Sequence, residues 1–448
     1  MKYSFKEKKF FIRKNFTPKD IITVIQKHKM LRGHYKLLRD YYVGKHEILY
    51  RSFNDDTKPN NRVVNNFAKL IVDTGTSYFT GLPITYNCKN IAYLDALNDI
   101  QKKNYADDVI SELDKMSDIY GHAFEFHYIR NGEEKFKPLS PDKIMVCYSD
   151  NINEDLLCAI VYDEYKDEVS NEIITNIEVY TDKEIWSFNA VDDEVKDLPI
   201  ITPHKFHRVP VVEFIANEER LGAFETVITA IDAYNIAVSD AINEVEYWND
   251  SYLLLRNLNA TTQEDILDMK RNRVLMLDGD GEAEFLTKDV NDKHFENIKD
   301  RLTADIHKFA QTPNLQDEQF ASNLSGVAIK YKMMGLEHKT AIKERKFNSA
   351  LQERIELITH FLNLQGCGYD EPVDVIFTRN LPSNLVELAD IVSKVRGVVS
   401  DETLRSTLPF IHDLEDEKLK IEREKQSLLD YDMNYIDNSE EENNENQE

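Results

Sequence analysis

Apolar residues recur at helical spacing in one short stretch that also carries clear start and stop signals. The apolar positions are three or four residues apart and predict a single buried stripe: Val64, Phe67, Ile71, Thr74 and Tyr78. Asn60 or Asn61 is the predicted N-cap, because a short side-chain oxygen accepts from the free amides of the first turn. Gly81 and Pro83 mark the end, since glycine suits the left-handed cap and proline cannot continue a helix.

The same spacing predicts further helices along most of the chain. They are expected within 1–50, over 104–120 with Gly121 as the stop, over Phe224–Val245, over Asp292–Gln311, over Asn323–Leu364, and as three short helices in 383–429. Gly326 and Gly335 are possible kinks in the longest of these.

Between His122 and Phe214 the period changes to two, which predicts strands. The candidates are Ala123–Tyr128, Cys158–Tyr165, Ile177–Tyr180, Ile185–Phe188 and Val209–Phe214, and Val373–Phe377 forms one more. A small β-like excursion follows the helix at 224–245. It comprises Leu253–Arg256, Val274–Leu277, the turn Asp278–Gly281 and Glu284–Leu286. The predicted fold class is α+β with a largely antiparallel sheet.

Length and charge limit the number of domains and the classes of protein that fit this sequence. A chain of 448 residues is expected to form two or three domains. Its net charge of −26 argues against a general nucleic-acid binder, yet residues 1–50 hold 13 Lys and Arg against 4 Asp and Glu. Two interpretations of this basic start stay open. It is either a solvated or disordered arm, or an arm that docks on an acidic neighbouring surface or meets DNA.

Cysteine spacing predicts a reduced, cytosolic protein with buried thiols, and the absence of long apolar runs predicts that there is no transmembrane helix. The four cysteines form no CxxC pair, and no apolar run approaches 18 residues. The first 16 residues lack the apolar core of a signal peptide.

Three phrases resemble the portal proteins of tailed double-stranded DNA bacteriophages, of the siphophage type. They are the helix opening and close (Asn61–Asn66 and Tyr78–Ile84), Ile231–Asn235, and Asn323–Ala328. The order of predicted elements is similar to that family over nearly the whole chain.

The resemblance implies a portal-type architecture with defined parts. These are an N-terminal arm and α/β wing (1–223), a stem helix (224–249), a small β-containing clip (250–291), a returning stem helix (292–311), a tunnel loop (312–325), a long helix and wing strand (326–382), a helical crown (383–429) and an acidic disordered tail (430–448). The tail holds 8 acidic residues and no basic ones, which by itself predicts disorder.

The resemblance also implies function and partners. Portal proteins form a ring, usually of twelve subunits, at one capsid vertex, and the ring is the channel for DNA packaging and ejection. The implied partners are double-stranded DNA, the terminase large subunit, head-completion or adaptor proteins, and the major capsid and scaffold proteins, with no membrane. The implied location is the virion, after assembly in the host cytoplasm.

By position in this architecture, two sets of residues are candidate contacts. The tunnel-loop and DNA-facing set is Gln316, Asp317, Gln319, Asn323, Lys330 and Lys332. The clip set for motor and connector docking is Leu254, Arg256, Arg271, Arg273, Leu275, Asp278 and Asp280.

The charge of the chain suits a channel for DNA. Each lysine or arginine on a phosphate adds a favourable, salt-dependent contact, so an acidic lining lets the polyanion slide. Lys339 and Lys343 on the long helix, like Lys330 and Lys332, either touch phosphates transiently or belong to a solvated face. The short strands of the clip need partners, so pairing between subunits is a hypothesis for Leu254 and Leu275.

The sequence carries no pattern that assigns catalysis, a cofactor or a metal. There is no GxxxxGK[ST] loop for ATP, and Asp278–Gly281 is interpreted as a tight turn rather than a calcium loop. His204 and His207 lack an adjacent acid or thiol, and His122 and His127 are interpreted as packing or surface residues. Glu244 and Glu246 are two apart on a helix and are expected on a solvated face. The alternatives to a portal are another phage assembly scaffold or a metal-dependent nuclease.

Overall fold

The computed structural model describes most of the chain. The described residues are 7–54, 58–168, 171–248, 252–256, 282–286, 292–315, 326–380, 390, 392–406, 408, 417–418 and 420–424. The chain divides into two compact units, Met1–Gln316 with Lys332–Asn380, and Asp317–Tyr331 with Leu381–Glu448.

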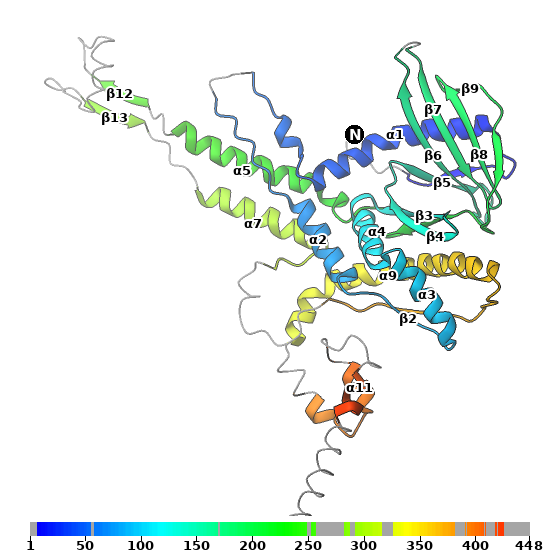
Figure 1. The fold of residues 1–448 in the computed structure, drawn as a ribbon. Coiled ribbons are helices and arrows are strands. Elements are labelled where there is room, and N and C mark those ends of the chain that lie inside the picture. Colours follow the sequence, from blue (N-terminus) through cyan, green and yellow to red (C-terminus); the bar gives the residue numbers. More distant parts are fainter. Residues whose placement is uncertain are drawn as a thin grey trace, which may run out of the picture. The chain divides into compact units, whose positions relative to one another are not determined.

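The first unit holds nearly all of the described elements (Figure 1). Its helices are α1 (Pro18–Tyr42), α2 (Phe67–Thr80), α3 (Ile91–Lys103), α4 (Ala106–Tyr120), α5 (Ile228–Trp248) and α7 (Asp292–Phe309), with the 3-10 turns η1 (Glu47–Tyr50) and η2 (Glu225–Val227). Helix α9 (Gly326–Leu364) has its first six residues in the second unit, where α11 (Asp401–Ser406) also lies.

Two sheets form the β part of the first unit. The larger contains β1 (Phe10–Ile12), β5 (Ile144–Ser149), β6 (Leu156–Lys166), β7 (Ile173–Tyr180), β8 (Glu184–Val191) and β10 (Ile200–Pro203) in that order, with β9 (Glu194–Val195) on β8. The smaller has the order β11 (Val211–Ile215), β3 (His122–Arg130), β4 (Glu133–Leu139). Two further pairs are β12 (Tyr252–Arg256) with β13 (Glu282–Leu286) and β14 (Asp374–Ile376) with β2 (Thr85–Asn87). Apart from the parallel β1–β5 pair, the ladders are antiparallel.

The layers follow from which faces are apolar. Helix α1 buries Ile21, Ile25 and Leu38 against the large sheet, along which it runs in Figure 1. The two sheets meet through a small apolar cluster that includes Phe124 of β3 and Val146 of β5. On the other side of the small sheet, α3, α4 and α9 share one core. The order of layers is therefore helix, sheet, sheet, helices.

The α+β class with a largely antiparallel sheet is confirmed, and so are several local predictions. Helix α4 ends at Gly121, whose φ is +88°. The strand candidates between His122 and Phe214 all fall on strands. The long helix predicted over Asn323–Leu364 is α9 (Gly326–Leu364), which continues through Gly335. The predicted start at Ser400 is confirmed, because Ser400 caps α11 by accepting from the Thr403 amide. Helix α3 was not predicted, although its sequence holds several apolar residues; it buries only Tyr93, Leu97 and the polar Gln101.

The predicted N-cap of the α2 helix is wrong by about five residues. The helix begins at Phe67, and Asn66 is the side chain that accepts from the Lys69 amide, at 3.0 Å. Residues 60–65 belong to no helix or strand; instead, the backbone amides of Asn61 and Asn65 bond to side chains of a distant helix.

The solvated or disordered interpretation of the basic N-terminus is wrong for residues 7–50. Many of their apolar side chains, among them Ile21, Ile25 and Leu38, are in the main core, and the ammonium of Lys8 is buried. It donates to the carbonyls of Tyr120 and Arg220 and pairs with Glu225 at 2.8 Å. Three acceptors compensate for the desolvation of this charge.

Candidate functional site

Helices α5 and α7 pack side by side in the region predicted as the stem, and α2 contacts both. The ring of Phe67 meets Tyr234 of α5 edge-on at 5.0 Å and His307 of α7 at 5.9 Å. Ile231 of α5 and Ile306 of α7 are fully buried in the same apolar core. Farther along α5, apolar side chains stay exposed: Ile236 at 45%, Ile242 at 40% and Val245 at 60%.

The extended segment before α2 docks along α5 through a ladder of hydrogen bonds. The backbone amide of Asn61 donates to the side-chain oxygen of Asn243 at 2.7 Å. Two residues on, the Val63 amide donates to Ser239 Oγ at 3.0 Å. After two more, the Asn65 amide donates to Asn235 Oδ1 at 2.8 Å. We call these three bonds the amide ladder.

The amide ladder is anchored at both ends. Asn235 is fully buried, and its side-chain amide donates to Nδ1 of His46 at 2.9 Å, while the other ring nitrogen of His46 contacts the Tyr41 carbonyl. At the far end the Asn61 side chain donates to Glu246 Oε2 at 2.6 Å. Burial lowers the pKa of His46, so its ring stays neutral and can accept from Asn235.

The amide ladder joins two of the phrases that resemble portal proteins, Asn61–Asn66 and Ile231–Asn235. Sequence periodicity missed it because it couples a period of two in one segment to a period of four in a helix about 170 residues away. Glu246 is exposed, as expected for a solvated face, and it also accepts a hydrogen bond from the Asn61 side chain.

The candidate clip residues are described only in part. Strand β12 pairs antiparallel with β13, and the register puts Leu254 opposite Glu284 and Arg256 opposite Glu282. One edge of β12 is therefore satisfied within the same chain. The other candidates lie outside the described residues: Arg271, Arg273, Leu275, Asp278 and Asp280.

The candidate tunnel residues divide in the same way. Lys330 is exposed and Lys332 half-buried near the start of α9. Gln316, Asp317, Gln319 and Asn323 lie outside the described residues.

Lys339 and Lys343 do not lie on a solvated, phosphate-accessible face of this chain, contrary to expectation. Lys343 is buried and pairs with Asp114 and Asp118 of α4. Burial raises the pKa of Asp114, and the Lys343 ammonium opposes that rise. Lys339 donates to the carbonyls of Ala223 and Ala310, and burial lowers its pKa. Both ammonium groups are used inside the fold.

A second buried ionic cluster joins α9 to the small sheet. The guanidinium of Arg354, fully buried, donates to the Glu125 carboxylate at 2.8 Å. His127 bridges Glu125 and Glu134 at 3.0 and 2.9 Å. Burial would lower the pKa of His127, but the two carboxylates raise it. His127 is therefore an internal electrostatic residue and not a surface one.

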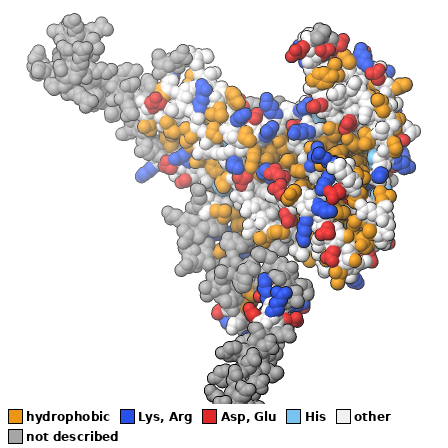
Figure 2. Space-filling view, viewed as in Figure 1, with side chains coloured by type: hydrophobic (Ala, Val, Ile, Leu, Met, Phe, Trp, Pro, Cys, Tyr) orange, Lys and Arg blue, Asp and Glu red, His pale blue; other side chains and the backbone are white. Residues whose placement is uncertain are grey.

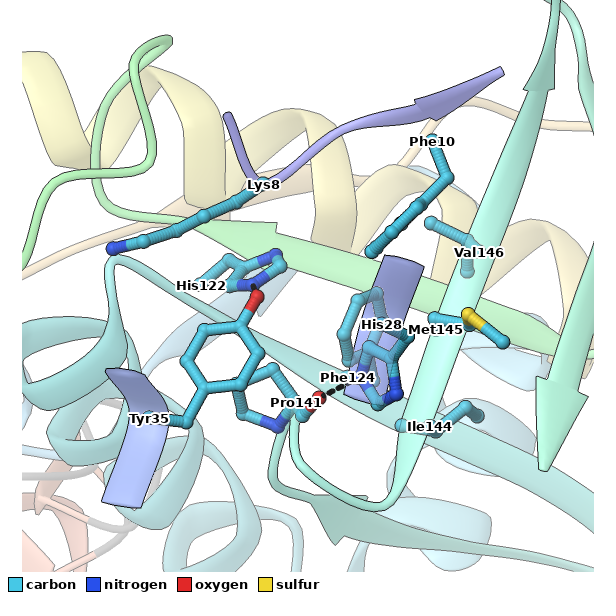
Figure 3. A pocket seen from close by; sticks show the side chains of 10 residues that line it. All are labelled: Lys8, Phe10, His28, Tyr35, His122, Phe124, Pro141, Ile144, Met145 and Val146. Atoms are coloured by element: carbon cyan, nitrogen blue, oxygen red, sulfur yellow. Dashed lines mark hydrogen bonds between the residues drawn. The ribbon is translucent and has the colours of Figure 1, made fainter. Parts of the chain in front are cut away.

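His122 belongs to a third buried cluster, in the interior drawn in Figure 3. Its Nδ1 contacts Glu213 at 2.6 Å and its Nε2 contacts the Tyr35 hydroxyl at 3.0 Å. Burial alone would raise the pKa of Glu213, but Arg220 and His122 hold it well below its usual range. The labelled side chains around it, which include Lys8, Phe10 and His28, leave no room for a water molecule.

The described residues hold no grouping of three or more His, Cys, Asp or Glu side chains able to hold a metal ion. Both ring nitrogens of His204 are engaged, with the Thr181 carbonyl and the Phe206 amide. Within the same part of the chain, no helix combines the length and apolarity needed to cross a membrane. Figure 2 shows acidic and basic side chains interspersed over the visible face.

Known portal proteins are similar to this chain over most of its length. Residues 22–429 match the family described as "Phage portal protein, SPP1 Gp6-like". The portal protein of Bacillus phage SPP1 is 25% identical over 422 residues, covering 90% of this chain and 83% of that protein. The portal protein of Clostridium phage phiCD119 is 24% identical over 419 residues, covering 86% and 92%. A chain of the solved structure "Neck of empty GTA particle computed with C6 symmetry" is similar at a TM-score of 0.47 and 12% identity, covering 77% of this chain and 90% of that one. The chain belongs to the SPP1 Gp6-like family of phage portal proteins.

Proposed function

We propose that copies of this chain form the portal ring at one vertex of a phage capsid, through which DNA is packaged and later ejected. The observation that carries the proposal is the family match over residues 22–429. In this role the chain is structural and not an enzyme. The ring is expected to contain about twelve copies and to reside in the virion after assembly in the host cytoplasm.

The element order supports an assignment of parts. Helices α5 and α7 are the stem, residues 250–291 with β12 and β13 are the clip, and residues 312–325 before α9 are the tunnel loop. The region 1–223 is the arm and wing, 326–382 supplies the long helix and wing strand, and 383–429 is the crown. The clip is the docking surface for the terminase large subunit and then for head-completion proteins.

Exposed apolar side chains on α5 support packing between subunits. A helix that is buried on one side only should present polar residues on the other, yet Ile242 and Val245 are exposed. Neighbouring copies in a ring would cover them. The DNA-facing surface is then left to the tunnel loop and to Lys330 and Lys332 near the start of α9.

Electron microscopy of the purified full chain at moderate salt tests the ring. End-on views should show a ring of about twelve or thirteen subunits with a central hole. A substitution of Val245 by Glu should reduce ring formation, because it would bury a charge between subunits. Ile173→Glu, at an exposed apolar position on the wing sheet, serves as the matched control. Monomers alone, also in the presence of coat and scaffold proteins, would overturn the proposal.

A further inference from the structure

The amide ladder exists because two different periods coincide. Two residues of extended chain advance about 6.6 Å, and four residues of α-helix advance about 6.0 Å. Every second amide of 61–65 therefore meets every fourth side chain of α5. The three bonds, at 2.7, 3.0 and 2.8 Å, all have ordinary lengths. The small difference between the two advances therefore does not prevent any of them.

The polar side chains of α5 allow this match in one register only. One turn before Asn235 stands Ile231, which is fully buried and has no side-chain acceptor. A slide of one turn in either direction would therefore change the partner of all three amides, and a slide toward Ile231 would set one amide against a side chain without an acceptor. It would also break the bond between Asn235 and His46.

We propose that Asn235, Ser239 and Asn243 are positioning residues that fix the axial register of α5 on the wing. The proposal rests on the proposed function through one assignment, that α5 is the stem helix leading to the clip. A slide of one turn would move the end of α5, and the strand β12 that follows it, by about 5.4 Å. The register therefore sets the height at which the clip is presented to its partners.

Amide hydrogen exchange at single-residue resolution tests the amide ladder on the full-length protein. The amides of Asn61, Val63 and Asn65 lie outside helices and strands, so their protection depends on α5. Ser239→Ala should accelerate exchange at Val63 by about 5- to 30-fold, with smaller changes at the other two. Ser349→Ala is the matched control, because that hydroxyl bonds only the preceding turn of its own helix. Full exposure of the three amides in the unmodified protein, or unchanged protection in Ser239→Ala, would overturn the amide ladder.

A pair of variants at Asn243 separates positioning from simple stability. Asn243 is half-buried, and leucine has the same branched skeleton of heavy atoms but no acceptor, whereas aspartate keeps the acceptor. In an assembly reaction with capsid proteins, motor and DNA, Asn243→Leu should lower the yield of DNA-filled heads severalfold while rings still form. Asn243→Asp should restore the yield.

Each outcome has a separate meaning. Absence of rings from the unmodified chain, also in the presence of coat and scaffold proteins, would contradict the proposed function, while the exchange result would still stand for the amide ladder. Intact rings with wild-type yields from Asn243→Leu combined with Ser239→Ala would overturn the positioning role. Recovery by Asn243→Asp alone would support it.

Discussion

The ammonium of Lys343 on α9 lies 2.7 Å from the Asp118 carboxylate on α4, and both side chains are almost completely removed from solvent. Asp114 flanks the same ammonium, and Thr80 donates to Asp114. Two acids and one base thus share a site with no solvent to screen them, and they join the long helix to the wing.

Replacing Lys343 by Met should destabilise the protein by about 3–5 kcal/mol, because two buried carboxylates would lose their counter-charge. Denaturant unfolding of the purified chain measures this. Lys346→Met is the matched control three residues away, where an exposed pair with Glu218 is worth less than about 1 kcal/mol. An equal loss of stability in the two variants would contradict the burial of the Lys343 ion pairs.

Gly121→Ala should prevent folding, or nearly so. At its φ of +88° an added Cβ would lie 1.7 Å from the Arg220 carbonyl oxygen, a backbone atom that cannot move aside. Gly132 has a similar φ of +79° but open space around it, so Gly132→Ala should cost only about 1–2 kcal/mol. The soluble yield and the thermal unfolding temperature of the two variants are compared. If both variants fold equally well, the clash between the added Cβ at position 121 and the Arg220 carbonyl oxygen must be relieved.

Stability should fall on acidification through His28. Its Nε2 donates to the Pro141 carbonyl, its Nδ1 lies 2.9 Å from the Tyr162 hydroxyl, and burial lowers its pKa to about 4. The unfolded chain takes up this proton near pH 6.5, so the contribution is fully present above that pH. It is lost as the pH falls toward 4, by about 3 kcal/mol in total. Denaturation midpoints between pH 7 and 4 measure the slope, and His28→Gln should flatten it; an unchanged slope in that variant would assign the effect to another group.

Thiol reactivity should divide the cysteines into two classes. Cys367 is exposed, whereas Cys147 and Cys158 are buried directly opposite each other on β5 and β6. A hydrogen bond with Cys147, together with burial, raises the pKa of the Cys158 thiol and leaves it unreactive. A disulfide reagent on the native protein should give one fast thiol that disappears in Cys367→Ser. A fast thiol that remains in that variant would contradict the burial of Cys88 or of the Cys147 and Cys158 pair.

Asn66→Ala should cost about 1 kcal/mol by removing the cap of α2. The Asn60→Ala variant should leave helix content unchanged, because Asn60 bonds the backbone of Arg51 and not the helix. Circular dichroism with thermal unfolding distinguishes the two positions. If Asn60→Ala were the more destabilising variant, the N-cap would be Asn60, as the sequence pattern predicts.

Local patterns were sufficient for most elements because the forces that form them are local. The stripe of α4 and its glycine stop lie within 16 residues, and the alternation of β3 reports burial directly. The capping error at Asn60 and Asn61 has the same origin. Those asparagines satisfy the usual pattern of a cap, and only the acceptors on α5 show that they are used elsewhere.

The role of the basic N-terminus could not be inferred from composition. Thirteen positive charges in 50 residues are typical of a solvated arm, but several of the described ones pair with carboxylates far along the chain. Lys8 pairs with Glu225, and Lys29 with Glu164 and Asp193. The same holds for Lys343, whose acids are 225 or more positions away. A helical pattern shows which side chains share a face, but not what covers that face.

The contact between Lys8 and Glu225 also limits when the N-terminal segment can complete its folding during synthesis of the chain. These residues are 217 positions apart, and ribosomes add about 5–20 residues each second. For roughly 10–40 s after Lys8 leaves the ribosome, its carboxylate partner Glu225 does not yet exist, and for most of that interval the apolar face of α1 has no finished sheet to cover. The first segment to be synthesised is thus among the last to be completed. A nascent subunit must pass through that interval without joining another chain, so the speed of translation bears on how many subunits reach the ring.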